Sequence, residues 1–97
     1  MNDISDISVL EKVKFEKLER LDLSENKISK INILEKVNFK QLKTLNLSYN
    51  NISNITVLDK VKFEKLERLD LRSNEIDLIK NNSIISKFQS LLKSINL

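Results

Sequence analysis

The sequence predicts an α/β repeat protein in which short parallel strands stack side by side. Three observations lead to this prediction: a 24-residue internal repeat, a change of apolar spacing inside each repeat, and the complete absence of glycine and proline. Tight hairpin turns favour positive φ angles and therefore glycine, so its absence argues against antiparallel hairpin folds. The length allows one domain, and we expect residues 1–97 to form it.

The repeat runs through the whole chain. Residues 4–27, 28–51 and 52–75 align without a gap, and residues 76–97 form a degenerate fourth copy. A period of this length is typical of stacked units, each of which is too small to bury its apolar side chains alone. We therefore expect about four units that share one continuous core.

The first three units carry the pattern L-x-x-L-x-L-x-x-N-x-I, which alternates at L-x-L and predicts a short strand there. In the first unit Leu21 and Leu23 point to one face of the strand and Asp22 points to the other. An asparagine follows each of the first three strands. Because its amide has both donors and an acceptor, we expect it to bond to the backbone of its own and the neighbouring unit. These structural asparagines are Asn26, Asn50 and Asn74.

The rest of each unit predicts one or two helical turns, at about 9–14, 33–38 and 57–62. Each segment follows a residue that commonly caps helices, with an acid at the third helical position. These caps are Ser8, Asn32 and Thr56. A matching turn is expected near 84–88.

The chain resembles the leucine-rich-repeat family over its whole length. The stretch N-x-I-x-x-I-x-x-L at residues 50–58 is similar to the 22-residue class of the protein phosphatase 1 regulatory subunit and bacterial internalins, although these units are two residues longer. The resemblance implies a right-handed solenoid with a parallel sheet on its concave side and helical turns on its convex side. It also implies a non-enzymatic module that binds a protein partner on the concave sheet.

In such a solenoid the strand positions between the leucines face the concave side. The candidate partner-binding residues are Arg20, Asp22, Thr44, Asn46, Tyr49, Arg68, Asp70 and Arg72. Arginine and tyrosine are enriched in binding hot spots. The alternative is a solvated sheet whose Arg and Asp side chains neutralise each other. Tyr49 could equally pack over the asparagines instead of meeting a partner.

Several other functions find no support in the composition. The chain has no histidine and no cysteine, so we expect no catalytic apparatus, cofactor or metal site. A net charge of +3 without a basic run argues against nucleic-acid binding. No apolar stretch approaches the roughly 18 residues that span a membrane. The polar, acidic N-terminus lacks a signal-peptide layout, which favours a cytoplasmic location.

Two other roles remain open from the sequence. The chain could be a structural segment of a longer repeat array without its own partner, or a regulatory subunit that docks on an enzyme such as a phosphatase. End repeats normally carry a polar outer face, and the sequence shows no dedicated caps. End-to-end self-association is therefore a further expectation.

Overall fold

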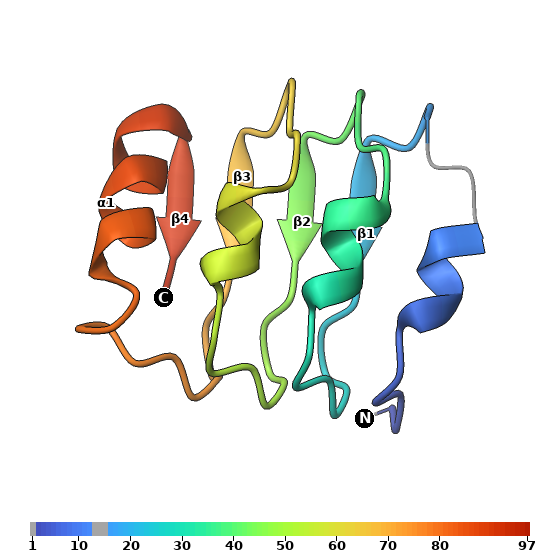
Figure 1. The fold of residues 1–97 in the computed structure, drawn as a ribbon, viewed down its shortest axis with the longest axis horizontal. Helices are drawn as coiled ribbons and strands as arrows, with labels where there is room; N and C mark the ends of the chain where they lie inside the picture. Colours follow the sequence, from blue (N-terminus) through green and yellow to red (C-terminus); the bar gives the residue numbers. More distant parts are fainter. Residues whose placement is uncertain (1, 13–15) are drawn as a thin grey trace.

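The computed structural model describes residues 2–12 and 16–97 and contains one open, four-stranded parallel sheet (Figure 1). The strands lie in the order in which they occur in the sequence, one for each repeat unit. They are β1 (Arg20–Asp22), β2 (Thr44–Asn46), β3 (Arg68–Asp70) and β4 (Ser94–Asn96). The predicted parallel stacking is confirmed, and the central residues Leu21, Leu45, Leu69 and Ile95 stand in one row across the sheet.

Three short helices lie on one side of the molecule, as Figure 1 shows, but they are 3-10 helices, and the second and third are shorter than predicted. They are η1 (Ser8–Lys12), η2 (Asn32–Lys36) and η3 (Thr56–Asp59). Residues 13–14 of the first expected turn lie outside the described residues. In a 3-10 helix the side chains at i and i+3 eclipse each other. The tighter turn therefore lets Ile31 and Leu34 both point into the core, and the Leu34 N–H donates to Ile31 O at 3.0 Å.

The expected capping role of Asn32 and Thr56 is wrong, because each is the first residue inside its turn. The preceding residue holds the cap position and forms no side-chain hydrogen bond there. Before η3, Asn54 Oδ1 accepts the Thr56 N–H at 2.9 Å and the Thr56 hydroxyl at 2.7 Å. Before η1, Asp6 Oδ1 accepts the Ser8 N–H in the same way, at 2.9 Å. The starts of η1 and η3 are thus held by a side chain two residues earlier than predicted, while Lys30 stands at the equivalent position before η2.

The fourth unit differs most from the prediction. Instead of a turn near 84–88 it contains a ten-residue α-helix, α1 (Asn82–Leu91), which packs beside η3 and β4. Ser83 lies inside this helix and Asn81 precedes it. The helix buries Ile84, Ile85 and Phe88, whose spacing of one and four residues places them on one helical face.

The core is one continuous cluster between the sheet and the helical side. The second unit is well enclosed, because it has a neighbouring unit on each side, and eight of its apolar side chains are buried. These are Ile28, Ile31, Leu34, Val37, Phe39, Leu42, Leu45 and Leu47. Phe39 also stacks on Phe63 of the third unit, with ring centroids 5.7 Å apart. By contrast Leu21 and Leu23 of the first unit are only half-buried.

One residue in each of the first three units adopts a left-handed backbone conformation, just before the structural asparagine. The φ angles are 58° at Glu25, 57° at Tyr49 and 56° at Ser73. The chain therefore uses positive φ once per turn of the coil, without any glycine. For an L-residue this conformation costs about 1–2 kcal/mol.

Replacing Ser73 with glycine should therefore stabilise the protein. Relief of the left-handed strain exceeds the extra backbone entropy of glycine, which is about 0.5–1 kcal/mol, so we expect a gain of roughly 0.5–1 kcal/mol. Urea denaturation followed by circular dichroism measures it. Ser29→Gly is the control, since Ser29 is an exposed loop residue without positive φ. A Ser73→Gly protein that is no more stable than Ser29→Gly would contradict the argument.

Candidate functional site: the outer face of the sheet

The sheet turns one face away from the helical side, and we call this surface the sheet face. It is formed by the strand positions that alternate with the core leucines and by residues just after the strands. Arg20, Asp22 and Arg68 are exposed on it, while Thr44, Asn46 and Asp70 are half-buried. Parallel pairing sets Arg20, Thr44 and Arg68 in one row and Asp22, Asn46 and Asp70 in the next. The structure thus brings the sequence-predicted residues of the strands onto a single surface.

The row formed by Asp22, Asn46 and Asp70 stabilises the turns that follow the strands, which was not predicted from the sequence. Asp22 Oδ1 accepts hydrogen bonds from the Ser24 N–H at 2.9 Å and the Ser24 hydroxyl at 2.6 Å. Asn46 Oδ1 makes the same pair of bonds with Ser48, at 3.0 and 2.7 Å. Each side chain therefore holds the backbone that leaves its strand. The signal was present in the sequence, since Asp or Asn two residues before Ser favours such side-chain turns.

Hydrogen bonds also lower the pKa values of the two acids in this row. The two bonds from Ser24 hold the pKa of Asp22 below its ordinary value, with a smaller contribution from the charge of Arg20. The pKa of Asp70 is lowered mainly by its hydrogen bonds with the Arg72 side chain. Both carboxylates are thus stabilised in their charged form at neutral pH.

The arginines of the other row, Arg20 and Arg68, have no comparable hydrogen-bond partners among the described residues. Within residues 2–12 and 16–97, neither Arg20 nor Arg68 makes a side-chain hydrogen bond or an ion pair. Asp22 bonds to Ser24 and Asp70 bonds to Arg72, so the acids do not pair with the arginines that precede them on their strands. Two arginines therefore stand on the sheet face with their backbones two strand spacings, or about 10 Å, apart.

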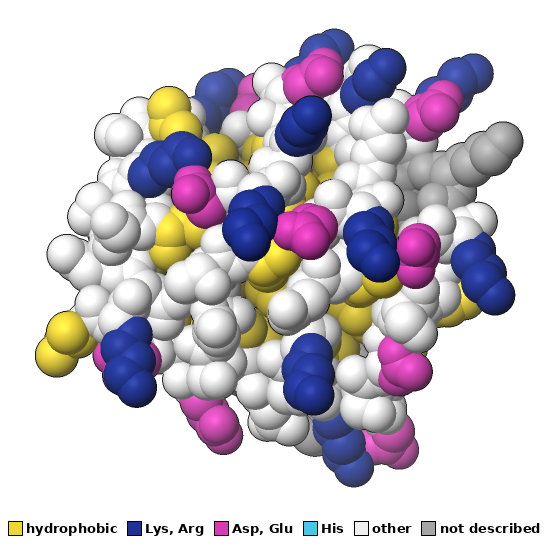
Figure 2. Space-filling model, in the orientation of Figure 1, with side chains coloured by type: hydrophobic (Ala, Val, Ile, Leu, Met, Phe, Trp, Pro, Cys, Tyr) yellow, Lys and Arg dark blue, Asp and Glu magenta, His cyan; other side chains and the backbone are white. Residues whose placement is uncertain are grey.

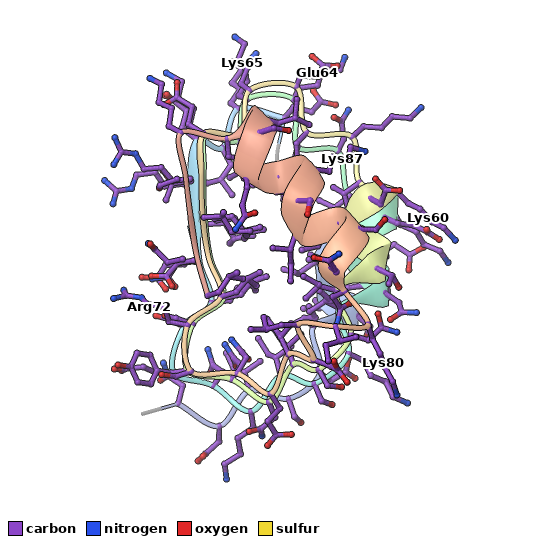
Figure 3. All side chains as sticks on the ribbon, turned by 90° about the vertical axis from the view of Figure 1, so that its left-hand side faces the viewer. Lys60, Glu64, Lys65, Arg72, Lys80 and Lys87 are labelled. Atoms are coloured by element: carbon purple, nitrogen blue, oxygen red, sulfur yellow. The ribbon has the colours of Figure 1, made fainter. Side chains whose placement is uncertain are left out.

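A third arginine lies where β3 ends. The Arg72 side chain donates hydrogen bonds to the Asp70 carboxylate from two nitrogens, Nη2 to Oδ2 at 2.7 Å and Nε to Oδ1 at 3.0 Å. Figure 3 shows Arg72 on the side of the sheet opposite α1 and Lys60. The Tyr49 N–H donates to Arg72 O at 2.8 Å, and the Tyr49 side chain is 56% exposed. Tyr49 and Arg72 thus form a neighbouring exposed pair at the lower edge of the sheet face.

The structural asparagines lie just beyond the strands, and Asn50 shows their bonding most fully. Its Nδ2 donates to Leu47 O and Ser48 O of its own unit and to Leu23 O of the preceding unit, at 3.0–3.2 Å. Its Oδ1 accepts the Ile28 N–H at 3.0 Å. One buried side chain therefore closes its own turn and ties it to the preceding unit.

The neighbouring asparagines repeat this arrangement. Asn74 Nδ2 donates to Leu47 O at 2.9 Å and to Leu71 O at 3.0 Å, while its Oδ1 accepts the Ile52 N–H. Asn26 Oδ1 accepts the Ile4 N–H at 3.2 Å. The asparagines therefore fix the spacing between units on which the geometry of the sheet face depends.

A further asparagine, Asn81, is buried in the degenerate unit and was not predicted from the sequence. Its Nδ2 donates to Asp77 O at 2.8 Å and to Ser53 O at 3.2 Å, and its Oδ1 accepts the Ile55 N–H at 3.2 Å. It links the last two units at a different position in the repeat. No regular spacing in the sequence marks it.

The remaining surface shows no comparable arrangement of chemistry. On the helical side, basic and acidic side chains are interspersed (Figure 2). A depression of about 870 Å³ is lined mainly by Ser and Asn side chains at and just before the starts of the helical turns. Among the described residues, no three His, Cys, Asp or Glu side chains are grouped to hold a metal ion, and no helix is long and apolar enough to cross a membrane.

The fold and the site define a parallel-stranded repeat protein with a polar outer sheet. A family model described as leucine rich repeat matches residues 18–76, more than half of the chain. The chain belongs to the leucine-rich-repeat family, as its repeats predicted, and the resemblance to the 22-residue class stays a prediction. This family is generally a non-enzymatic interaction fold. A search of curated proteins finds no match.

Proposed function

We propose that the protein is a non-enzymatic module that binds a protein partner on the sheet face. The observation that supports this most directly is the pair of unpaired guanidinium groups of Arg20 and Arg68, which stand beside acids that bond elsewhere. A guanidinium without an intramolecular partner can bind a carboxylate with two parallel hydrogen bonds without first breaking another bond. Tyr49 and Arg72 extend the same surface.

The arrangement favours a partner that presents acidic side chains about 10 Å apart, the spacing of Arg20 and Arg68 across two strands. Thr44 and Asn46, between these arginines, are half-buried and uncharged. They leave room for a backbone or a small side chain of the partner. The acids of the sheet face hold their own turns, so we assign them a supporting role in shaping the surface.

Partner binding should depend on Arg20 and Arg68. We expect the Arg20→Ala/Arg68→Ala protein to bind its partner about 10- to 100-fold more weakly, since truncating a hot-spot arginine costs about 1–2 kcal/mol or more. Immobilised wild-type and variant proteins would be compared for the proteins that they recover from a lysate. Quantitative mass spectrometry identifies the candidate partner, and titration of the purified partner gives the affinity.

Lys60→Ala/Lys80→Ala is the matched control, because it also removes two cations, and these lie on the helical side and away from the sheet face (Figure 3). It should recover the partner as wild type does. Equal recovery by all three proteins would refute binding on the sheet face. A recovered partner that is an enzyme, such as a phosphatase, would favour the regulatory-subunit role.

A further inference from the structure

The sheet is open at both ends, and each end leaves part of the core uncovered. Within the part of the chain that the structure describes, β1 and β4 each have a neighbouring strand on one side only, so each presents an edge that can pair with another strand. At the first edge Leu21 is half-buried, and at the last edge Ile95 is half-buried and Leu97 is 44% exposed. The equivalent Leu45 inside the sheet is completely buried.

Charges alternate along the row of residues that precedes the strands. The row reads Glu19, Lys43, Glu67, Lys93. Lys43 Nζ lies 3.3 Å from Glu19 Oε1, and Lys93 Nζ lies 3.3 Å from Glu67 Oε2. The row therefore begins with an acid at one edge of the sheet and ends with a base at the other, so its two ends are complementary.

The junction between β2 and β3 shows what the two edges would form together. There the segment Lys-Thr-Leu-Asn (43–46) lies parallel to Glu-Arg-Leu-Asp (67–70). The edge at β4 reads Lys-Ser-Ile-Asn (93–96), and the edge at β1 reads Glu-Arg-Leu-Asp (19–22). The second segment is identical and the first differs only by two conservative replacements. The β4 and β1 edges thus carry the same complementary pair of sequences as a junction that the chain already makes.

We propose that a second copy of this chain docks head to tail, with its β1 edge paired in parallel with the β4 edge of the first. Inside the chain the Arg68 N–H donates to Lys43 O at 3.0 Å, and the Leu47 N–H donates to Asp70 O at 2.8 Å. The equivalent bonds across the new junction run from the Arg20 N–H to Lys93 O and from the Leu97 N–H to Asp22 O. Leu21 of the second copy packs beside Ile95, and Lys93 faces Glu19.

This contact is heterologous, because it uses a different edge on each copy. Each added copy exposes the same two edges again, so the assembly grows beyond the dimer, as an open chain or as a ring of several copies. A symmetric pairing of two β1 edges, centred on Leu21, would run the strands antiparallel and set Glu19 opposite Leu23. It would leave the lysine–glutamate complementarity unused. The assembled sheet would also continue the alternating arginine row of the sheet face.

The size of the protein in solution tests the proposal. Sedimentation velocity and light scattering of the 97-residue chain, from low micromolar to millimolar concentration, should give a weight-average mass that rises steadily and passes the mass of a dimer. A monomer at every concentration would overturn the proposal. So would growth that stops at the dimer, which would instead indicate a symmetric contact.

Charge reversal at the junction tests its geometry. Glu19→Lys should weaken association about three- to tenfold, because it replaces the attraction between opposite charges at the proposed junction with a repulsion between two lysines. Glu35→Lys is the control, since it makes the same charge change at an exposed position on the helical side of the second unit. It should associate as wild type does. Equal weakening by both variants would refute the assigned contact.

A second reversal makes the test independent of any loss of stability in the single variant. The Glu19→Lys/Lys93→Glu protein places an acid and a base opposite each other again at the head-to-tail junction, with their signs exchanged. Its association should recover toward wild type, although both substitutions disturb pairs inside the chain. A double variant that associates more weakly than Glu19→Lys alone would overturn the assignment. Far-ultraviolet circular dichroism verifies that each variant is folded.

Discussion

Replacing Asn50 with alanine is expected to lower the free energy of unfolding by about 3–5 kcal/mol, one of the two largest effects in this protein. The amide makes four hydrogen bonds to backbone groups, three as a donor and one as an acceptor. Alanine leaves the N–H of Ile28 without its acceptor, and a buried group that stays unsatisfied costs about 1–3 kcal/mol. The carbonyls of Leu23, Leu47 and Ser48 each keep another donor, from Asn26, Asn74 and Glu25, so each of these three lost hydrogen bonds costs about 0.5–1.5 kcal/mol.

Urea denaturation followed by circular dichroism measures the loss. Asn51→Ala is the matched control, because Asn51 is the adjacent residue and its side chain is exposed. A surface change of this kind should alter the free energy of unfolding by less than about 0.5 kcal/mol. A difference of less than about 1 kcal/mol between the two variants would contradict this expectation, because a single unsatisfied group already costs about that much. It would show that water replaces the amide of Asn50 at little cost.

The same residue explains why the sequence predicted the sheet so closely. The alternating leucines give the faces of the strands, and the constant distance from leucine to asparagine gives their register. Leu21, Leu45 and Leu69 stand side by side because each lies 24 residues after the last, and the asparagine of each unit is bonded to the unit before it. The constant spacing of 24 residues therefore predicts which residues of neighbouring parallel strands pair with each other.

The prediction failed where the repetition ends. In the fourth unit two additional residues and a different composition break the alignment. The short turn expected there was based only on the turns of the first three units. The apolar residues Ile84, Ile85 and Phe88 instead form a helical stripe, and α1 results. Asn81 was not predicted for the same reason. Like the regular asparagines it bonds to the backbone of the preceding unit, but it lies at a different position in the repeat.

The candidate site was predicted in its location but only partly in its chemistry. Alternation alone placed Arg20 and Asp22 on the outer face of a strand. It could not say that Asp22 bonds to Ser24 while the Arg20 side chain makes no hydrogen bond or ion pair within the described residues, because that choice depends on the backbone that leaves the strand. The sequence left open whether the two charges neutralise each other, and the structure shows that the charge of Arg20 acts on Asp22 without a direct contact between them.

Substitution of the central leucines should reveal the stacking of the units as a gradient of stability. Leu45→Ala is expected to cost about 3–4 kcal/mol, because Leu45 is completely buried between Leu21 and Leu69 and its removal leaves a closed cavity. Leu21→Ala removes the same atoms from the same row and should cost only about 1–2 kcal/mol. Leu21 is half-buried at the edge of the sheet, so water already reaches it and can enter the space.

The comparison must be made by urea denaturation at low micromolar concentration, where association contributes least. Equal costs for Leu21→Ala and Leu45→Ala under these conditions would mean that the first unit is as enclosed as the second, which contradicts the open edge at β1. Raising the protein concentration then gives a further expected result. If the β1 edge of one copy covers the β4 edge of another, Leu21 becomes buried beside Ile95. The stability cost of Leu21→Ala should then rise with concentration, while that of Leu45→Ala stays constant.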